Sequence, residues 1–363
     1  MLPDLWVLPN LLAHLVLCAI VARLLWRRLA RQPAVVGALW TTVGVVAFGL
    51  ALGALTAPAR GAFALLLTWS WTLGLVLPAV LLWVSTKLIA RRAARFVGYG
   101  LLAAAVGIVA LTVDAFCVEP TALEVTHHVV RSTRVARPLR IAVIADLQTD
   151  APGPYEARAL TRVMDAQPDL ILFPGDLIQL RDPEAHAAAW AELSRIVADV
   201  GLSAPLGVWV TQGDSESADW KSHARAAGLR PLGAGLEVRP DVRLTGLDLQ
   251  ASAGPQSLVR AGPAFSIVVG HRPDFALGDS DADLLLAGHT HGGQVQLPWV
   301  GPLITLSAVP RAWADGLTQL GRDTTLIVSR GVGMERGVAP RLRLWCAPEV
   351  VIVDVLPAHD GAL

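Results

Sequence analysis

The sequence predicts an α/β domain preceded by a transmembrane region of four helices. Charge and hydropathy change near residue 114, because the segment before it contains nine basic residues but only one acid, Asp4. Subtraction from the totals of 30 basic and 30 acidic residues leaves 21 and 29 for residues 114–363, a net charge of −8. A part of about 250 residues can bury one full hydrophobic core. Its acidic balance argues against nucleic acid as a partner.

Four stretches are long and apolar enough to cross a bilayer, which takes roughly 20 residues each. We expect a transmembrane region at residues 1–117, with helices at about residues 5–26, 34–55, 62–83 and 96–116. A cleaved signal peptide is the alternative for the first stretch. The three spans that follow it favour a membrane anchor.

Basic residues cluster after the first and third expected spans, whereas the second connection has only Arg60. The clusters are Arg27, Arg28 and Arg31, then Lys87, Arg91, Arg92 and Arg95. The positive-inside rule places both clusters in the cytoplasm. We therefore expect a multi-pass protein of the inner (plasma) membrane, with residues 118–363 on the outer (periplasmic or extracellular) face.

Five apolar runs in the later part of the chain end at residues that can bind a metal. They are residues 141–145 before Asp146, 170–173 before Asp176, 208–210 before Asp214, 266–269 before His271, and a last run before His289 and His291. Short apolar runs bounded by Gly or Pro predict buried strands, and open α/β sheets place their sites at the carboxyl ends of strands. Carboxylate, imidazole and amide groups at these tips are typical of a two-metal centre.

Helical spacing of apolar residues predicts helices at residues 155–166 and 183–200, between the predicted strands. This alternation indicates a βαβ layout, and a strand at residues 123–130 precedes it. Short strands at residues 236–247 and 324–355 indicate a second sheet packed on the first.

Two cysteines of the later part raise the question of a disulfide. Cys117 and Cys346 could pair in an oxidising exterior, or both could stay buried free thiols. The sequence does not give the Cα separation that a disulfide requires.

Residues 118–355 resemble the calcineurin-like metallophosphoesterases, in particular a bacterial membrane-tethered branch. Three motifs carry the resemblance: Gly288-His289-Thr290-His291-Gly292-Gly293-Gln294 followed by Leu297-Pro298, then Ser329-Arg330-Gly331-Val332-Gly333, and Pro348-Glu349. The resemblance implies a domain at residues 118–363 that is a four-layer α/β/β/α sandwich and binds two divalent metal ions.

The resemblance also implies a role for each candidate ligand. Asp146 and His291 match ligands of the first metal, and His271 and His289 match ligands of the second. Asp176 matches the carboxylate that bridges both ions, which lie about 3.5–4 Å apart in two-metal hydrolases.

The chain departs from the family pattern in two motifs. Gln148 stands where the family has histidine, and Gly213-Asp214-Ser215-Glu216 replaces Gly-Asn-His followed by an acid. Gln148 can coordinate through its amide oxygen, and Asp214 can replace asparagine as a ligand. More oxygen donors favour Mn²⁺, with Mg²⁺, Fe and Zn²⁺ as alternatives.

Ser215 stands where the family has a histidine, and a serine hydroxyl cannot act as a cationic general acid. General acids typically raise reaction rates about 10²- to 10⁴-fold. The enzyme could be slower, could favour good leaving groups, or could recruit Glu216, His223 or His186. The catalytic candidates are therefore Asp176, Ser215 and Glu216. We expect Arg330 to pair with a carboxylate instead of phosphate.

The first functional hypothesis is a membrane-anchored phosphohydrolase, in which a hydroxide held between two divalent ions attacks phosphorus. The substrate is then a phosphoester or phosphodiester, and the tether points to a lipid-linked or envelope phosphoester. The alternative is a sensory or scaffold module that binds metal but has lost efficient catalysis. A transporter is disfavoured, because the spans lack any acid beyond Asp4. The oligomeric state is not predicted.

Overall fold

The structure, a computed structural model, describes residues 7–56, 61–260 and 262–358. The chain forms two compact units: Met1–Phe116 with Glu335–Arg341, and Cys117–Met334 with Leu342–Leu363. The domain limits of 1–117 and 118–363 stay a prediction, because compactness alone does not define a domain.

The first unit is built from apolar helices. Within the described residues, four helices have the length and composition of membrane spans: Val7–Arg28, Ala34–Thr56, Ala62–Ile89 and Arg92–Thr121. The expected start of the first span at residue 5 lies outside the described residues. The helices that contain the third and fourth expected spans continue beyond residues 83 and 116, to Ile89 and Thr121, and the limits of the spans themselves stay a prediction.

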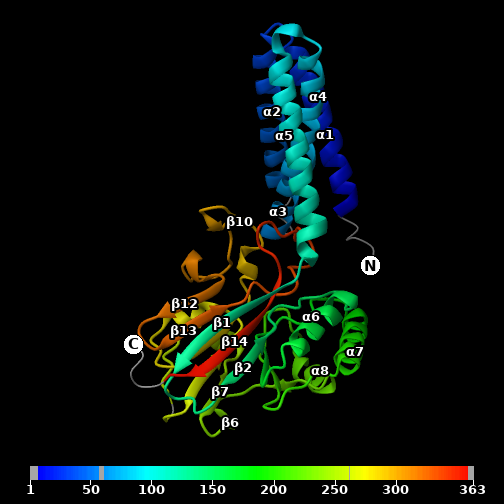
Figure 1. The fold of residues 1–363 in the computed structure, drawn as a ribbon. Coiled ribbons are helices and arrows are strands. Elements are labelled where there is room, and N and C mark those ends of the chain that lie inside the picture. Colours follow the sequence, from blue (N-terminus) through cyan, green and yellow to red (C-terminus); the bar gives the residue numbers. More distant parts are fainter. Residues whose placement is uncertain (1–6, 57–60, 261, 359–363) are drawn as a thin grey trace. The chain divides into compact units, whose positions relative to one another are not determined.

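The two longer spans are made of several helical segments. The elements are α1 (Val7–Arg28), α2 (Ala34–Thr56), α3 (Ala62–Trp71), the π-helical η2 (Thr72–Val76), α4 (Leu77–Ile89), η3 (Arg92–Ala94), α5 (Arg95–Val113), the π-helical η4 (Asp114–Val118) and η5 (Glu119–Thr121). The π-helical segments continue the helices without a break (Figure 1).

Polar and small residues lie at the contacts between these helices. His14 of α1 is buried with its Nε2 2.9 Å from the Thr72 hydroxyl. A Cβ added at Gly53 of α2 would lie 2.5 Å from the hydroxyl oxygen of Thr68. Small residues let membrane helices approach closely, and buried polar groups there pair with one another. Large apolar side chains such as Val106 remain on the outer faces.

The first sheet of the second unit has six strands and carries its helices on one side. The strand order is β1 (Glu124–Ser132), β14 (Glu349–Pro357), β2 (Leu139–Val143), β3 (Leu170–Phe173), β4 (Val208–Val210) and β5 (Arg230–Pro231). The strands from β2 to β5 are parallel. The connecting helices are α6 (Pro154–Asp165), α7 (Pro183–Val200) and α8 (Trp220–Ala226). This arrangement confirms the predicted βαβ layout.

The second sheet also has six strands. Their order is β12 (Gly316–Leu320), β13 (Thr324–Val328), β9 (Leu284–Ala287), β8 (Phe265–Val269), β7 (Val242–Gly246) and β6 (Leu236–Arg239). Shorter elements connect them: α9 (Leu249–Ser252), η6 (Pro273–Leu277), η7 (His291–Gly293), η8 (Arg311–Trp313) and the hairpin of β10 (Gln296–Leu297) and β11 (Gly301–Pro302).

One strand was assigned to the wrong sheet from the sequence. The sequence predicts the run up to Val355 in the second sheet, but β14 lies in the first, parallel to β1 and antiparallel to β2. Its side chains alternate between two cores, with Val351 and Val353 facing one and Val350 and Ile352 the other. A strand that is buried on both faces fits an interior position of a sheet.

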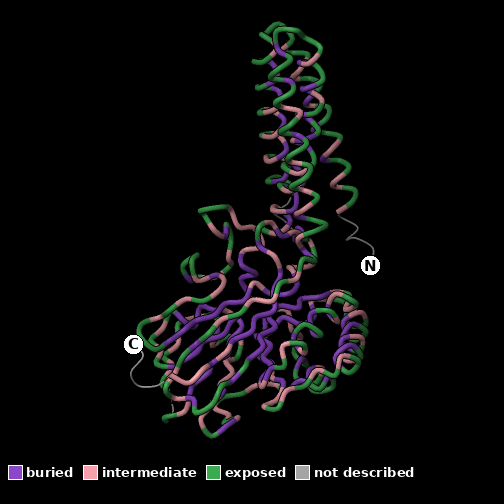
Figure 2. Tube along the Cα trace, viewed as in Figure 1, coloured by how far each residue is buried: buried purple, intermediate pink, exposed green. Residues whose placement is uncertain are grey.

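Three clusters of buried side chains define the layers of the second unit. One lies between the two sheets and combines residues such as Ile141 and Ile267. A second joins the first sheet to α6, α7 and α8, and a third covers the outer face of the second sheet, where Phe275 of η6 is buried. The inner strands of both sheets, such as β3, β8 and β9, are accordingly buried along most of their length (Figure 2), whereas the edge strands β1 and β12 are not. The predicted four-layer α/β/β/α sandwich is confirmed, and short helices form its fourth layer.

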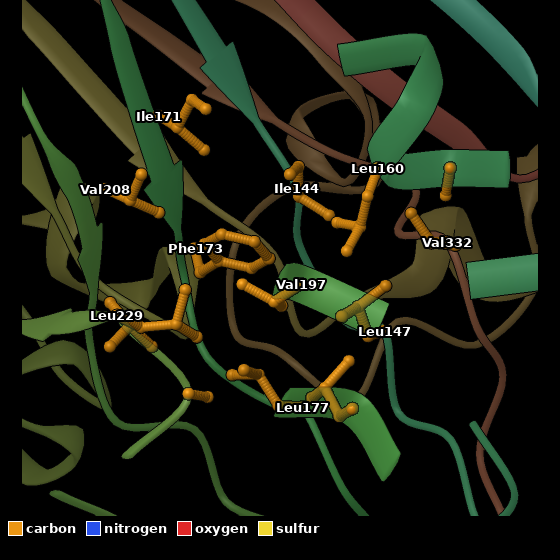
Figure 3. Packing of buried hydrophobic residues seen from close by; sticks show 14 of the residues in the cluster. Ile144, Leu147, Leu160, Ile171, Phe173, Leu177, Val197, Val208, Leu229 and Val332 are labelled. Carbon is orange, nitrogen blue, oxygen red and sulfur yellow. The ribbon is translucent and has the colours of Figure 1, made fainter. Parts of the chain in front are cut away.

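The helical layer is specified by local signals as well as by packing. Figure 3 shows Phe173 of β3 beside Val197 of α7. Helix α7 has the predicted limits because Asp182 caps it by accepting a hydrogen bond from the Ala185 N–H, and Gly201 ends it at φ 68°. Helix α6 begins and ends one residue earlier than expected.

Candidate metal centre

The candidate ligands follow strands of both sheets. Asp146, Asp176 and Asp214 come after β2, β3 and β4 of the first sheet, while His271 and His289 follow β8 and β9 of the second. The sequence predicts a single sheet edge, which accounts only for Asp146, Asp176 and Asp214. The site is formed where the carboxyl ends of the two sheets meet.

The backbone at several of these residues is unusual. Asp146, Gln148, Asp176, His289 and His291 all have positive φ angles, between 34° and 70°. Positive φ is uncommon for residues other than glycine, and such strained positions cluster at functional sites. These turns direct the side chains away from the strands and toward one another.

Four side chains meet at the first group of candidate ligands. His271 Nε2 lies 3.2 Å from His289 Nδ1 and 3.6 Å from Asp176 Oδ2. Asp214 Oδ2 is 3.2 Å from His289 Nδ1. The ligand atoms of Asp214, His271 and His289 all lie within 4.8 Å of one another, the spacing of a metal site.

The outer ring nitrogens of both histidines fix their tautomers. His271 Nδ1 is 2.8 Å from the Pro174 carbonyl oxygen, and His289 Nε2 is 3.1 Å from the Leu306 carbonyl oxygen. A carbonyl oxygen can only accept, so each of these nitrogens carries the hydrogen. In the neutral form of each ring, which a metal ion requires, the inner nitrogen carries a lone pair, and the two lone pairs face each other next to two carboxylates. Metal-binding histidines are held in this way by outer partners, and the donor set fits a divalent cation.

The second group is fully buried and shares residues with the first. Ligand atoms of Asp146, Asp176 and His271 lie within 4.8 Å of one another. The backbone N–H of His289 donates to both carboxylate oxygens of Asp146, at 3.1 and 3.0 Å. Burial raises the pKa of Asp146 to about 7, although the charge of His271 works in the opposite direction.

The electrostatics of the two groups favour a cation. Burial lowers the pKa of His271, but the charges of Asp176, Asp214 and Asp146 outweigh it and raise that pKa to about 10. Burial also opposes ionisation of Asp214, yet hydrogen bonds from His271 and His289 hold its pKa below the ordinary value. Carboxylates packed this closely are stabilised by positive charge between them.

Two expected ligands of the first metal stand at the edge of these groups. His291 is buried, its Nδ1 has no hydrogen-bond partner among the described residues, and burial holds its pKa well below the ordinary value. It thus presents a neutral imidazole, the form that binds metals, but it belongs to neither close group. Gln148 is also buried, and its backbone N–H donates to the Asp176 carbonyl at 2.7 Å.

Residues 213–216, which depart from the family pattern, support Asp176 through hydrogen bonds. The Ser215 backbone N–H donates to Asp176 Oδ1 at 2.8 Å. The carboxylate of Glu216 accepts three backbone hydrogen bonds, from Asp176 at 3.1 Å, Leu177 at 2.7 Å and Gly213 at 2.6 Å. Glu216 therefore joins the two loops that carry Asp176 and Asp214.

A search of known proteins shows the family. Over 255 residues the chain is 31% identical to the uncharacterized metallophosphoesterase YkuE of Bacillus subtilis (strain 168), covering 64% of this chain and 86% of that protein. The chain belongs to the metallophosphoesterases. It is also 28% identical over 236 residues to the phosphodiesterase YaeI of Escherichia coli (strain K12), covering 61% of this chain and 83% of that protein. No family model matches the chain.

Among solved structures, one similar chain is a conserved uncharacterized protein of Streptococcus pneumoniae TIGR4 described as a predicted phosphoesterase. The similarity covers 57% of this chain and 80% of that one, at 14% identity and a TM-score of 0.26.

Access to the metallophosphoesterase site is from the side of Asp214. The side chains of Asp146 and His271 are 0% exposed, whereas that of Asp214 is 30% exposed. Arg272 is 35% exposed, and its Nη2 donates to Asp214 Oδ2 at 2.8 Å. The extra negative charge that Asp214 brings to this metallophosphoesterase is therefore balanced by a neighbouring cation.

A loop between β13 and β14 supports the buried group of this metallophosphoesterase. The Gly333 N–H donates to the Asp146 carbonyl at 2.6 Å, and a Cβ added at Gly331 would lie 2.8 Å from the Asp146 Cβ. The loop is held by Arg343, which is fully buried and donates to the carbonyl oxygens of Arg330, Gly331 and Gly333. Sequence reasoning missed Arg343, because an arginine in a coil segment carries no signal of burial.

Two further expectations can be compared with the structure. Arg330 pairs with Glu124 at 2.8 Å and Glu349 at 2.9 Å, which confirms that it binds carboxylates. Cys117 and Cys346 are free thiols, and only Cys346 is buried. Cys346 Sγ lies 3.3 Å from the His291 carbonyl oxygen, and burial raises its pKa to about 11.

Proposed function

We propose that this metallophosphoesterase is a membrane-anchored phosphohydrolase that cleaves phosphoester or phosphodiester bonds with a two-metal centre. The observation that supports it most strongly is the pair of imidazole nitrogens 3.2 Å apart, each with its opposite nitrogen fixed by a backbone carbonyl. Two neutral rings that face each other with lone pairs beside carboxylates are unfavourable without a cation, so this arrangement of donor groups suits a divalent metal ion.

The proposed ligands divide between two positions. Asp214, His271, His289 and Asp176 would hold one ion, and Asp146, Asp176, His291 and Gln148 the other, with Asp176 shared. When bound, two divalent ions would supply Lewis acidity and lower the pKa of water enough for it to attack phosphorus at neutral pH. The oxygen-rich donor set favours Mn²⁺, with Mg²⁺, Fe and Zn²⁺ as alternatives.

The chain's own side chains orient and neutralise the substrate. Arg272 stands beside the exposed carboxylate of Asp214, where an incoming phosphoester would meet it. Ser215 can donate a hydrogen bond to a leaving oxygen, but it is no cationic acid, so we expect a preference for good leaving groups. Glu216 acts as a positioning residue through its three backbone hydrogen bonds.

The test is hydrolysis of a bis-aryl phosphodiester by the full-length protein loaded with Mn²⁺. We expect turnover that EDTA removes and that Asp176→Asn lowers to background, because the shared ligand is lost. Asp323→Asn, at an exposed turn, is the matched control and should keep full activity. Equal turnover by the wild type and Asp176→Asn, in metal-replete protein, would instead favour a sensory or scaffold module.

We further propose that the catalytic unit lies on the outer face of the inner membrane. The support is the placement of Arg27, Arg28 and Lys87 in the last turns of α1 and α4, which the positive-inside rule assigns to the cytoplasm. A lipid-linked or envelope phosphoester is then the substrate class that the anchor favours.

A further inference from the structure

An exposed apolar segment follows the metal-binding motif of the second unit. It is defined by the turn of the β10–β11 hairpin and the residues just after it: Trp299, Val300, Leu303, Ile304 and Leu306. Trp299 is fully exposed, and the exposed fractions of the other four are 54, 41, 43 and 56%. The hairpin stands apart from the two large sheets (Figure 1), and its turn is exposed (Figure 2). Contiguous exposed apolar groups mark interaction sites.

The chemistry of this apolar segment differs from that of an ordinary water-facing loop. Residues 292–310 contain no Asp, Glu, Lys or Arg, and the first charge after them is the exposed Arg311. The second unit as a whole is acidic, so an uncharged stretch of this length is a local exception. An indole at a turn tip, flanked by aliphatic side chains and followed by a basic residue, suits the interface of a lipid bilayer.

The apolar segment is held in place by hydrogen bonds to the rest of its unit. The Leu303 N–H donates to the Val295 carbonyl at 3.3 Å. Asp274 accepts from the Ser307 hydroxyl at 2.7 Å and the Ala308 N–H at 2.8 Å. Because its ends are anchored, the segment presents its apolar side chains in a fixed arrangement.

The apolar segment is also continuous with the candidate metal centre. The carbonyl oxygen of Leu306 is the outer partner of His289, 3.1 Å from its Nε2. Anything that binds the apolar side chains is therefore brought close to the site where His289 and His271 meet.

The chain's own helices favour a lipid bilayer as the partner of this apolar segment. Among the described residues, four helices have the length and hydropathy of membrane spans, and a unit tethered by them would meet its own membrane at a high effective concentration. We propose that the apolar segment enters the bilayer interface, with Trp299 at the level of the lipid headgroups. The metal centre then works beside lipid phosphates. Contact with the bilayer does not require the proposed hydrolase activity, whereas its consequence for the substrate rests on that proposal.

The experiment measures lipid contact directly in the full-length chain. Trp299→Cys in a Cys117→Ser background is labelled with an environment-sensitive fluorophore and reconstituted in phosphatidylcholine nanodiscs with or without a doxyl-labelled lipid. Cys18 and Cys346 are buried and should not react. Arg322→Cys, at the exposed turn between β12 and β13, is the matched control. Val106→Cys, on the outer face of α5, reports whether the spans are embedded.

We expect doxyl lipid to quench the label strongly at positions 299 and 106 but not at position 322, with a blue-shifted emission at 299. Quenching at 106 without quenching at 299 would overturn the proposal while leaving the membrane anchor intact. Concentration-dependent energy transfer between labels at 299 of different copies, without lipid quenching, would also overturn it, in favour of a second copy as the occupant. Val300→Cys gives the same test if Trp299→Cys does not fold.

Discussion

Asp214, the most exposed candidate ligand of the site, forms an ion pair with the guanidinium of Arg272. Asp214 Oδ2 is 2.8 Å from Arg272 Nη2 and 3.2 Å from His289 Nδ1, so the guanidinium holds the carboxylate against the imidazole. An asparagine at this position, as in the family motif, would need no such partner. The two residues therefore form one functional unit.

Arg272→Ala is expected to weaken Mn²⁺ binding about 10- to 100-fold, the usual cost of losing a partner that orients a ligand. Isothermal titration of Mn²⁺ into the metal-free protein measures it, with the exposed Arg322→Ala as control. In an Asp214→Asn background, Arg272→Ala should weaken Mn²⁺ binding much less, because the negative charge that Arg272 pairs with is gone. Equal losses in both backgrounds would contradict a direct coupling of the two residues.

Ser215 marks the position where the family carries a histidine. Ser215→His is expected to raise turnover by roughly 10²-fold or more for substrates with poor leaving groups, and less for aryl esters. Rates across a series of leaving groups test this, with Ser217→His as the nearby control. An unchanged dependence on the leaving group would mean that the missing histidine does not limit this enzyme.

At the scale of elements, the loop at residues 329–333 depends on one buried guanidinium. Arg343 donates to the carbonyls of Arg330, Gly331, Gly333 and Cys346. Burial lowers the pKa of Arg343. Hydrogen bonds from a charged group are stronger than neutral ones, and a buried group that loses its partners is costly.

Arg343→Lys is expected to lower the free energy of unfolding by roughly 2–4 kcal/mol, because one ammonium cannot reach all of these carbonyls. Thermal unfolding of the detergent-solubilised protein would show a lower midpoint than the wild type. Arg322→Lys, an exposed change of the same kind, should leave the midpoint unchanged. A wild-type midpoint for Arg343→Lys would show that the loop is held by other contacts.

Local signals predicted those elements whose limits are set nearby in the chain. The strands before Asp146, Asp176, Asp214 and His271 and the helix α7 follow from apolar runs, a capping aspartate and a terminal glycine. The place of β14 between β1 and β2 depends on pairing across more than 200 residues, which no local pattern encodes. For the same reason, the contribution of the second sheet to the site could not be derived from strand tips alone.

The same limit applies to the candidate site. Sequence reasoning could propose the candidate ligands because carboxylates and imidazoles after buried strands are a local signal. It missed Arg272 and Arg343, since only the folded chain shows that one pairs with Asp214 and the other fills a cage of carbonyl oxygens. It could not foresee the three backbone partners of Glu216 either.

At the scale of the whole molecule, the proposed topology determines which compartment supplies the substrate. Reporter fusions after Val355 test it: alkaline phosphatase should be active and green fluorescent protein dark, since the positive-inside rule places this end outside. Fusions after Arg31 should give the opposite result. A fluorescent fusion after Val355 would place the catalytic unit in the cytoplasm.

The central claim is that ligands from both sheets hold two cations through Asp176. Anomalous diffraction from Mn²⁺-loaded crystals of the full-length protein tests it most directly. We expect two peaks about 3.5–4 Å apart, one among Asp214, His271 and His289 and the other beside Asp146, with Asp176 touching both. A single peak away from Asp176, or none in metal-replete crystals, would contradict the account.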